Sequence, residues 1–251
     1  MKNMLYQPYK WFFAFPSLVL STIFFSVLSI ILAKLVNPKT GRVVGGTAWA
    51  KFIGVITPMQ VTVHGLEHID RRQSYVIASN HQSHFDILVI YGWMGIDPMW
   101  VMKQELRKIP IFGLACEKVG MIFIDRSNTE TAVRSLKTAK TRVVNGSSVI
   151  FFPEGTRSRD GNLRPFKKGA FKMALDLELP ILPVTILGTR NILPPDSLSL
   201  FPGRVEMTIH PPVDISGYTG ETLPGLMEAI RRQILSPMPP SSKGLSNGLE
   251  E

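Results

Sequence analysis

A histidine and an aspartate stand at a spacing that suits acid–base chemistry. They are His81 and Asp86, within the stretch V-I-A-S-N-H-Q-S-H-F-D of residues 76–86. The apolar run 76–78 predicts a buried strand, and the apolar run that begins at Phe85 predicts a helix. Two positions five residues apart on one helix are rotated by about 140°, so these side chains meet only if His81 lies in the turn before the helix. The carboxylate would then orient the imidazole, whose other nitrogen would take a proton from a hydroxyl group.

Other interpretations of these residues stay open. The pair can be a helix cap with a satisfied hydrogen bond and no catalytic role. His84 is a rival base, only two residues before Asp86. His81 and His84 can also be read as a metal pair, but zinc sites usually have three or four protein ligands, and no cluster of Cys or His stands elsewhere in the sequence. We therefore expect neither a metal nor a cofactor.

A second stretch with chemical potential is F-P-E-G-T-R-S, which follows the apolar run 148–152. That run predicts another strand, so Glu154 and Arg157 would be displayed at a strand end. Gly155 permits a positive φ or a close approach of the backbone. Arg157 can bind a phosphate through two parallel N–H groups. Alternatively, Glu154 and Arg157 pair only with each other in a structural turn.

Two further cations follow predicted strands. Lys103 ends the run 98–102, and Arg126 comes shortly after the run 120–124. Ligands of open α/β sheets bind at the carboxyl ends of the strands, so Lys103, Arg126 and Arg157 would form one basic pocket. The alternative is scattered surface charge, which is the usual place of Lys and Arg.

The composition favours an anionic partner. The 251 residues carry a net charge of +9 and the pI is about 9.8. Between residues 103 and 172 there are 15 Lys and Arg against 6 Asp and Glu, so the positive field belongs to this part of the chain. The basic residues are not interleaved with aromatic ones, so we expect no nucleic-acid partner. The one cysteine, Cys116, excludes an intrachain disulfide, and its apolar neighbours predict a buried, inert thiol.

The N-terminal part predicts membrane attachment. Residues 11–33 contain no charged side chain, which is long enough to cross a hydrocarbon layer of about 30 Å. A second, more polar segment covers residues 43–59. Positive charge flanks the first segment on both sides, so the positive-inside rule gives no orientation. We prefer a helix pair embedded in one leaflet of the cell membrane, with the catalytic domain on the cytoplasmic face, and keep a single full span as the alternative.

The rest of the chain alternates between strand and helix patterns, which indicates an α/β fold with a mixed, largely parallel sheet flanked by helices. Residues 204–210 alternate in polarity and are expected at an edge of the sheet. We expect membrane-anchoring helices in residues 1–59, the α/β domain in residues 60–236 and a disordered tail in residues 237–251. Strands are expected at 60–66, 76–78, 98–102, 120–124, 148–152, 181–187 and 204–210, and helices at 85–94, 129–144, 168–177 and 223–235.

Four stretches together resemble one family. N-H-Q-S-H-F-D, G-M-I-F-I-D-R, F-P-E-G-T-R-S and L-P-I-L-P-V-T-I occur in the order seen in glycerolipid acyltransferases, and the chain is most similar to the 1-acyl-glycerol-3-phosphate acyltransferases. The resemblance covers residues 60–212. It implies a membrane-bound enzyme that moves a fatty acyl group from a thioester, either acyl-CoA or acyl carrier protein, to the sn-2 hydroxyl of lysophosphatidic acid, giving phosphatidic acid for phospholipid synthesis.

The resemblance also implies roles for single residues. His81 would be the general base and Asp86 its orienting partner. Arg126, Glu154, Gly155 and Arg157 would bind the acceptor, with Lys103 as a further contact to its phosphate. Pro183, in the fourth stretch, would belong to the region of the acyl chain.

The sequence also bears on the reaction path. No nucleophile with its own base stands out, so we expect direct transfer without an acyl-enzyme, and backbone N–H groups at the start of the helix after His81 would meet the oxyanion. Another lysolipid as the acceptor, or a non-catalytic protein that binds anionic membrane lipids, remains as an alternative.

Overall fold

The computed structural model describes residues 2–125, 143 and 146–240. Helices precede the first strand and then alternate with strands. The helical elements are α1 (Lys2–Tyr9), η1 (Lys10–Ala14), α2 (Phe15–Leu35), α3 (Pro38–Thr40), η2 (Gly41–Gly45), α4 (Gly46–Ile56), η3 (Leu66–His68), α5 (Phe85–Trp93), η4 (Gln104–Lys108), α6 (Phe112–Lys118), α8 (Gly169–Leu177), α9 (Thr189–Ile192) and α10 (Leu223–Leu235). The strands are β1 (Met59–His64), β2 (Val76–Ser79), β3 (Asp97–Lys103), β4 (Ile122–Ile124), β5 (Ser147–Phe151), β6 (Ile181–Leu187) and β7 (Gly203–Ile209).

The strands form one mixed, largely parallel sheet, as the sequence predicts. Their order is β1-β7-β6-β2-β5-β3-β4. The run from β6 to β4 is parallel throughout, and β7 pairs antiparallel with β6 and parallel with β1. The carboxyl ends of β2, β5 and β3 therefore meet at one edge of the sheet, which is where the chemically interesting stretches begin.

The prediction that residues 204–210 form an edge strand is wrong. β7 lies inside the sheet, between β1 and β6. Its alternation arises because Val205, Met207 and Ile209 are buried on one face while residues between them reach the other, less covered face. Alternation reports how the two faces are covered, not whether a strand has a neighbour on each side.

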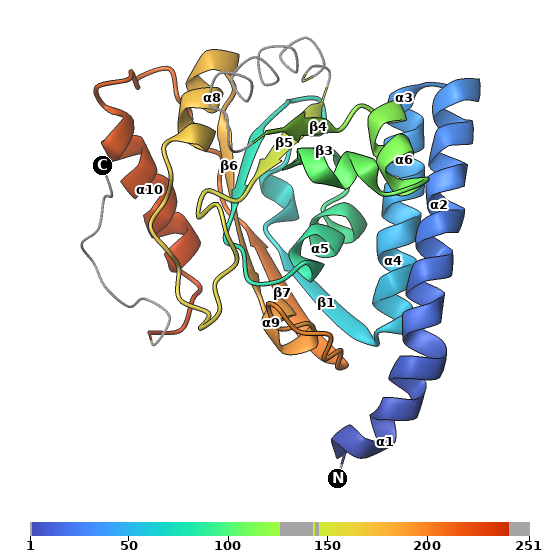
Figure 1. Cartoon of the computed structure of the whole chain (residues 1–251). Helices are drawn as coiled ribbons and strands as arrows, with labels where there is room; N and C mark the ends of the chain where they lie inside the picture. Colours follow the sequence, from blue (N-terminus) through green and yellow to red (C-terminus); the bar gives the residue numbers. More distant parts are fainter. Residues whose placement is uncertain (1, 126–142, 144–145, 241–251) are drawn as a thin grey trace.

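Helices cover both faces of the sheet (Figure 1). On one face, α4 and α5 pack over a core that includes Ile53, Val89 and Val205. On the other face, α8 and α10 pack over a core that includes Phe171 and Ile230. Because β2 lies between these layers, each of its residues is buried, and this explains its uninterrupted apolar run.

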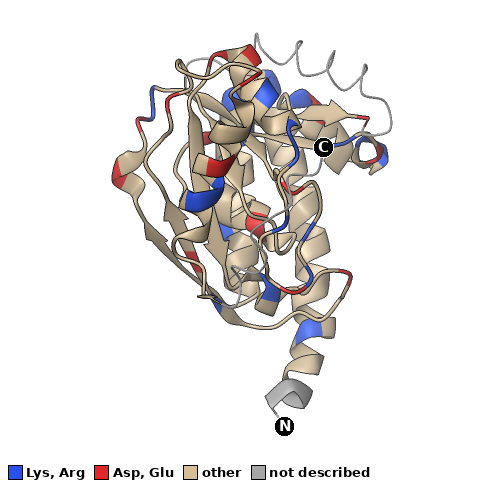
Figure 2. Ribbon diagram, turned by 90° about the vertical axis from the view of Figure 1, so that its left-hand side faces the viewer, with Lys and Arg blue, Asp and Glu red and all other residues tan. Residues whose placement is uncertain are grey.

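A long apolar helix forms the outer boundary on the first face. The stretch Tyr6–Leu35 is continuous and apolar enough to cross a membrane by length and composition, and little of it is buried inside the protein. In Figure 2 the helix that leads to the N-terminus is mostly tan, while blue and red residues are spread over the α/β domain. α4 packs against α2, but its 11 residues are too few to span a bilayer alone.

Small residues allow this helix to approach the chain that follows it. A Cβ atom at Gly45 would lie 2.0 Å from Ser29 Oγ, and one at Gly41 would lie 2.5 Å from the Ser29 carbonyl oxygen. The two glycines are four residues apart, an arrangement that lets helix backbones meet closely in apolar surroundings. Any larger side chain at either glycine would separate the two helical segments.

A buried ion pair connects η2, which contains Arg42, to the sheet. Arg42 donates to both carboxylate oxygens of Asp97 and to the Val119 carbonyl oxygen, and Ser147 also donates to Asp97. Asp97 and Ser147 begin β3 and β5, so the clamp lies at the amino edge, away from the carboxyl edge that holds His81. Removing one partner would leave a buried charge without its counter-ion, typically at a cost of about 3–5 kcal/mol.

Two expectations fall on residues that are largely undescribed. The helix expected at 129–144 lies outside the described residues except for position 143. Of the expected tail, residues 241–251 lie outside them, and Met238 packs into the second core.

Candidate active site

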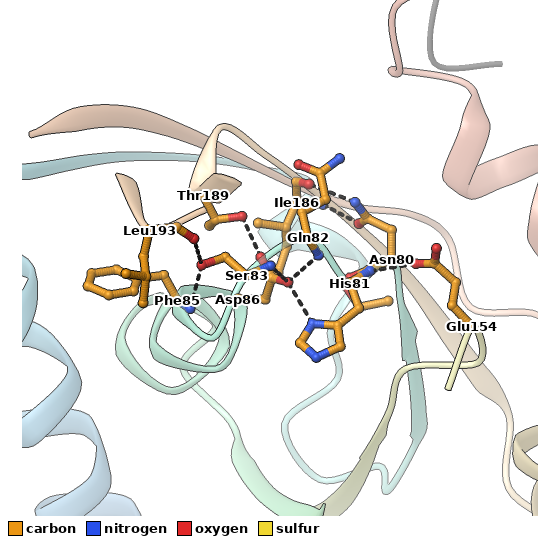
Figure 3. A network of polar contacts seen from close by, with 11 residues as sticks. Asn80, His81, Gln82, Ser83, Phe85, Asp86, Glu154, Ile186, Thr189 and Leu193 are labelled. Carbon is orange, nitrogen blue, oxygen red and sulfur yellow. Dashed lines mark hydrogen bonds and ion pairs between the residues drawn. The ribbon is translucent and has the colours of Figure 1, made fainter. Parts of the chain in front are cut away.

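His81 and Asp86 meet as the strand–turn–helix interpretation predicts (Figure 3). His81 lies in the turn between β2 and α5, and its Nδ1 is 2.8 Å from Asp86 Oδ2. Asp86 lies in the first turn of α5 and has no exposed surface. The bend in the chain before α5 turns the His81 side chain toward Asp86, so that the two side chains meet.

The surroundings of Asp86 fix the tautomer of the imidazole. Oδ2 accepts hydrogen bonds from the backbone N–H groups of Gln82 and Ser83, at 2.7 and 2.9 Å, in addition to that of His81. Oδ1 accepts a hydrogen bond from Thr189 Oγ1 at 2.5 Å. Because Asp86 acts as an acceptor throughout, His81 Nδ1 carries the proton and Nε2 carries the lone pair.

Nε2 is therefore the nitrogen available for chemistry. It makes no hydrogen bond to the part of the chain that the structure describes, and the His81 side chain keeps 14% of its surface exposed. The Phe152 ring stacks on the imidazole, with 3.9 Å between ring centroids and 16° between planes. The ring is thus held on one face and at one nitrogen, with the other nitrogen open to a ligand.

Three backbone N–H groups at the start of α5, where the sequence predicts donors to the oxyanion, already make hydrogen bonds within the protein. The N–H groups of Gln82 and Ser83 at the start of α5 point to Asp86, and the N–H of Phe85 donates to Ser83 Oγ. The first two donors orient the carboxylate, and none of the three is free to meet a developing oxyanion.

Glu154 supports the backbone of His81. Its Oε1 accepts the His81 N–H at 2.6 Å and its Oε2 accepts the Arg164 N–H at 2.9 Å. The residue is buried, and this burial raises the pKa of the Glu154 carboxyl to about 8, although the two N–H groups oppose the shift. The Ser158 N–H donates to the His81 carbonyl oxygen at 2.7 Å, so the loop 152–164 holds the His81 peptide from both sides.

The alternative in which Glu154 pairs with Arg157 is wrong. Arg157 donates to Asp196 at 3.0 Å instead. The resemblance assigned Glu154 to the acceptor, but both of its oxygens are taken by backbone N–H groups. Gly155 has φ of +71°, so the turn does need a residue that tolerates a positive φ.

Arg157 belongs to a polar cleft next to the His81–Asp86 pair, which we call the dyad. The cleft is lined by Thr156, Arg157, Arg159, Arg164, Pro195 and Asp196. Its guanidinium groups exceed its single carboxylate, so the cleft suits an anion. Arg164 links the cleft to the histidine, because its own N–H is held by the same Glu154 that holds His81.

The other predicted cations are placed differently. Lys103 is exposed at the end of β3, two strands from β2, which corresponds to roughly 10 Å across the sheet. Its side chain makes no hydrogen bond or ion pair to the described part of the chain. Arg126 lies outside the described residues. The three-cation pocket stays a prediction, and the described cleft gathers Arg159 and Arg164 instead.

Two supporting residues were missed by the sequence analysis. Asn80 exchanges two hydrogen bonds with the backbone of Ile186, at 2.8 and 2.7 Å, and so ties the end of β2 to β6. Thr189 reaches Asp86 from the turn after β6, where Gly188 has φ of +94°. The only sequence signal for Thr189 was its position directly after a strand end. Pro183 lies in the middle of β6, where it pairs with Ala78.

The surroundings of the rival groups His84 and Cys116 do not favour catalysis. Loss of hydration, followed by the nearby Arg157 cation, lowers the pKa of His84, and none of the described hydrogen bonds joins His84 to a carboxylate. Burial raises the pKa of the Cys116 thiol to about 12, so it stays protonated, as the sequence predicts for an inert thiol. Among the described residues no group of His, Cys, Asp and Glu could hold a metal ion.

The fold and site define a class of protein: an α/β domain with a carboxylate-oriented imidazole and an arginine-lined cleft, attached to an apolar helix. The chain belongs to the acyltransferase family, whose model matches residues 60–187. This confirms the resemblance found in the four sequence stretches.

Relatives extend the match beyond that region. The crystal structure of the 1-acyl-sn-glycerophosphate (LPA) acyltransferase PlsC from Thermotoga maritima is 30% identical, superimposes with a TM-score of 0.76, and 93% of each chain is covered. The 1-acyl-sn-glycerol-3-phosphate acyltransferase alpha of Mus musculus is 35% identical over 183 residues, which is 71% of this chain and 63% of the mouse protein. A 1-acyl-sn-glycerol-3-phosphate acyltransferase of Limnanthes douglasii is 32% identical over 210 residues, with 82% and 72% covered. The chain thus spans slightly less than two thirds of the mammalian relatives it matches.

Proposed function

We propose that the protein transfers a fatty acyl group from an acyl thioester to the sn-2 hydroxyl of 1-acyl-glycerol-3-phosphate, giving phosphatidic acid. The observation that carries this proposal is the His81–Asp86 pair, with Nδ1 held at 2.8 Å and Nε2 open. The names of the relatives support the same acceptor and product.

The chemistry follows from the tautomer. Nε2 of His81 takes the proton of the sn-2 hydroxyl as its oxygen attacks the thioester carbonyl carbon. The C–S bond of the resulting tetrahedral species breaks, and the imidazolium returns the proton to the departing thiolate. Asp86 stabilises the imidazolium that forms in between, and a positioned base of this kind contributes roughly 10²–10⁴-fold.

The arginine-lined cleft would position the acceptor. Its phosphate carries the charge that Arg157, Arg159 and Arg164 complement, and binding it there presents the neighbouring hydroxyl to His81. Arg126 and Lys103 remain candidates for the same phosphate. Glu154 would act by holding the His81 and Arg164 backbones at a fixed separation.

Features outside the site suit a lipid substrate. The helix Tyr6–Leu35 is apolar and largely uncovered, which supports attachment to a membrane. We propose that the α/β domain lies on the cytoplasmic face of this membrane. An apolar cavity between α2, α5 and α6 is lined by Phe25, Ile87 and Phe112 among others, and offers a place for hydrocarbon. We keep the embedded helix pair as our preferred arrangement.

The test is product formation by the purified protein. Radiolabelled lysophosphatidic acid is incubated with acyl-CoA in one arm and with acyl carrier protein in the other, and lipids are separated by chromatography. We expect phosphatidic acid in at least one arm, and competition by lysolipids with larger head groups to be weak. No phosphatidic acid with either donor, or preferential use of another lysolipid, would overturn the proposal.

A further inference from the structure

The loop between β3 and α6, together with the first turn of α6, exposes aliphatic side chains that the site does not use. Of the large hydrophobic residues exposed in the described α/β domain, three lie within six positions of one another, at Ile109, Ile111 and Leu114. They are 44%, 38% and 48% exposed, and the remaining two, Leu66 and Leu198, stand alone. Scattered single residues need no explanation, but a cluster at one turn indicates a contact.

The backbone of this loop is strained at its tip. Ile111 has φ of +64° and ψ of −55°, and the Phe112 N–H donates to the Pro110 carbonyl oxygen at 2.6 Å. This is a γ-turn of the rare hand, and a β-branched residue is especially unfavourable there. The chain therefore holds an isoleucine in a costly conformation while 38% of its surface stays exposed to solvent. A contact outside the chain would account for both features.

The loop lies next to the apolar helix and at the catalytic edge. It follows the carboxyl end of β3, the edge of the sheet that also holds His81. α6 packs against α2, and Figure 1 shows the two side by side. Phe112 and Cys116 of α6 line one apolar cavity together with Phe25 of α2. The exposed aliphatic residues thus border the helix that we propose to be in the membrane.

The charges around the loop match an anionic lipid surface. Lys103, Arg107, Lys108 and Lys118 are exposed around it, against Glu105 and Glu117. Apolar tips flanked by Lys and Arg are typical of segments that insert into the interface of an anionic bilayer. A water-soluble protein partner has no comparable support from the neighbouring apolar helix.

We propose that Ile109, Ile111 and Leu114 insert into the bilayer and form a second membrane contact, at the mouth of the site. This proposal depends on the proposed function in one respect: the bilayer that the three residues enter is the one that holds the lipid acceptor. The strained turn fixes the side chains outward, so the loop needs no rearrangement before it binds. It would hold the carboxyl edge of the sheet at the lipid surface, which the N-terminal helix alone does not determine.

A depth measurement tests this without relying on activity. An environment-sensitive fluorophore is attached through Ile109→Cys in the full chain, and through Leu66→Cys as the control, which is equally exposed but follows β1 at the opposite edge. Cys116 is buried and protonated and should not be labelled. With vesicles of phosphatidylcholine and phosphatidylglycerol, we expect brominated lipids to quench the probe at Ile109 at least threefold more than the probe at Leu66. Equal quenching, or an Ile109 probe as open to aqueous iodide as the control on bound vesicles, would overturn the proposal and favour a protein partner.

A second variant separates membrane contact from folding. Ile111→Gly removes the side chain but relaxes the backbone at the positive φ, so the protein should be no less thermally stable. Combined with Ile109→Ser and Leu114→Ser, it should lower turnover of vesicle-embedded acceptor roughly tenfold relative to the same acceptor in detergent micelles, because buried aliphatic surface is lost. Leu66→Ser should leave this ratio unchanged. An unchanged ratio in the triple variant would also contradict the proposal, and the probe measurement stands even if the acceptor is not lysophosphatidic acid.

Discussion

Replacing Asp86 by Asn removes the negative charge of the dyad while keeping the size and shape of the side chain. The amide can keep its oxygen where Oδ2 accepts from His81 and from the N–H groups of Gln82 and Ser83, and can place its NH₂ group toward Thr189, whose hydroxyl can accept. The packing should therefore persist while the negative charge is lost. What changes is the stabilisation of the His81 imidazolium during proton transfer.

The size of the expected loss in kcat follows from the distance between the two charges. With the Nδ1–Oδ2 contact at 2.8 Å, the two charge centres lie about 4 Å apart, and an effective dielectric constant near 20 gives about 4 kcal/mol. Each 1.36 kcal/mol is a factor of ten in rate, so kcat should fall roughly 10³-fold, with little change in the KM for the acceptor.

The assay is steady-state formation of phosphatidic acid, with circular dichroism to verify folding and Asp214→Asn, at an exposed loop, as the matched control. A kcat within tenfold of the wild type in folded Asp86→Asn would refute the assigned role of the carboxylate.

Three further predictions follow from other contacts. Thr189→Val removes the hydrogen bond to Asp86 Oδ1 and should lower kcat roughly tenfold. Thr189→Ser keeps a hydroxyl group and should retain most of the wild-type kcat. Equal kcat values for the two variants would argue against a positioning role of Thr189. Arg157→Ala should raise the KM for the phosphorylated acceptor about 10–100-fold, because hydrogen bonds to charged groups are worth about 1.5–3 kcal/mol. The control Arg72→Ala, at a remote and exposed position, should leave this KM unchanged. An unchanged KM in Arg157→Ala would indicate that Arg157 serves only a structural turn. Burial, and then the neighbouring His68, lowers the pKa of His210 to about 4 from the ordinary 6.5, so the folded state is disfavoured by protonation. The test compares the thermal stability of the wild type with that of His210→Gln in detergent, because the raised pKa of Glu154 contributes a pH dependence of opposite sign that both proteins share. The difference between the two proteins should be constant above pH 6.5, and the wild type should lose up to about 3 kcal/mol relative to the variant as the pH drops from 6.5 to 4; a difference that does not change over this range would exclude the assignment.

The sequence was most informative where the information is local. Apolar runs placed the strands to within one or two residues, and β6 and α10 have the predicted bounds. The meeting of His81 and Asp86 followed from a spacing that only a bend before the helix can satisfy. The motif positions, taken together, also gave the family.

Long-range partners could not be predicted in the same way. Glu154 binds the backbone of His81, 73 positions away, and Thr189 reaches Asp86 across 103 positions. Neither contact leaves a periodic or spaced signal, because it depends on which strands become neighbours. The interior position of β7 was missed for the same reason, since a strand with one covered face alternates in polarity wherever it lies in the sheet.

The central claim is that Nε2 of His81 takes the proton from the acceptor hydroxyl. The most direct measurement compares turnover of His81→Ala with that of His84→Ala, the neighbouring histidine without a described carboxylate partner, using the donor that supports product formation. We predict a fall in kcat of about 10²–10⁴-fold for His81→Ala, unchanged vesicle binding, and a change of no more than a few-fold for His84→Ala. Near-normal turnover by folded His81→Ala, or a larger loss in His84→Ala, would contradict the account.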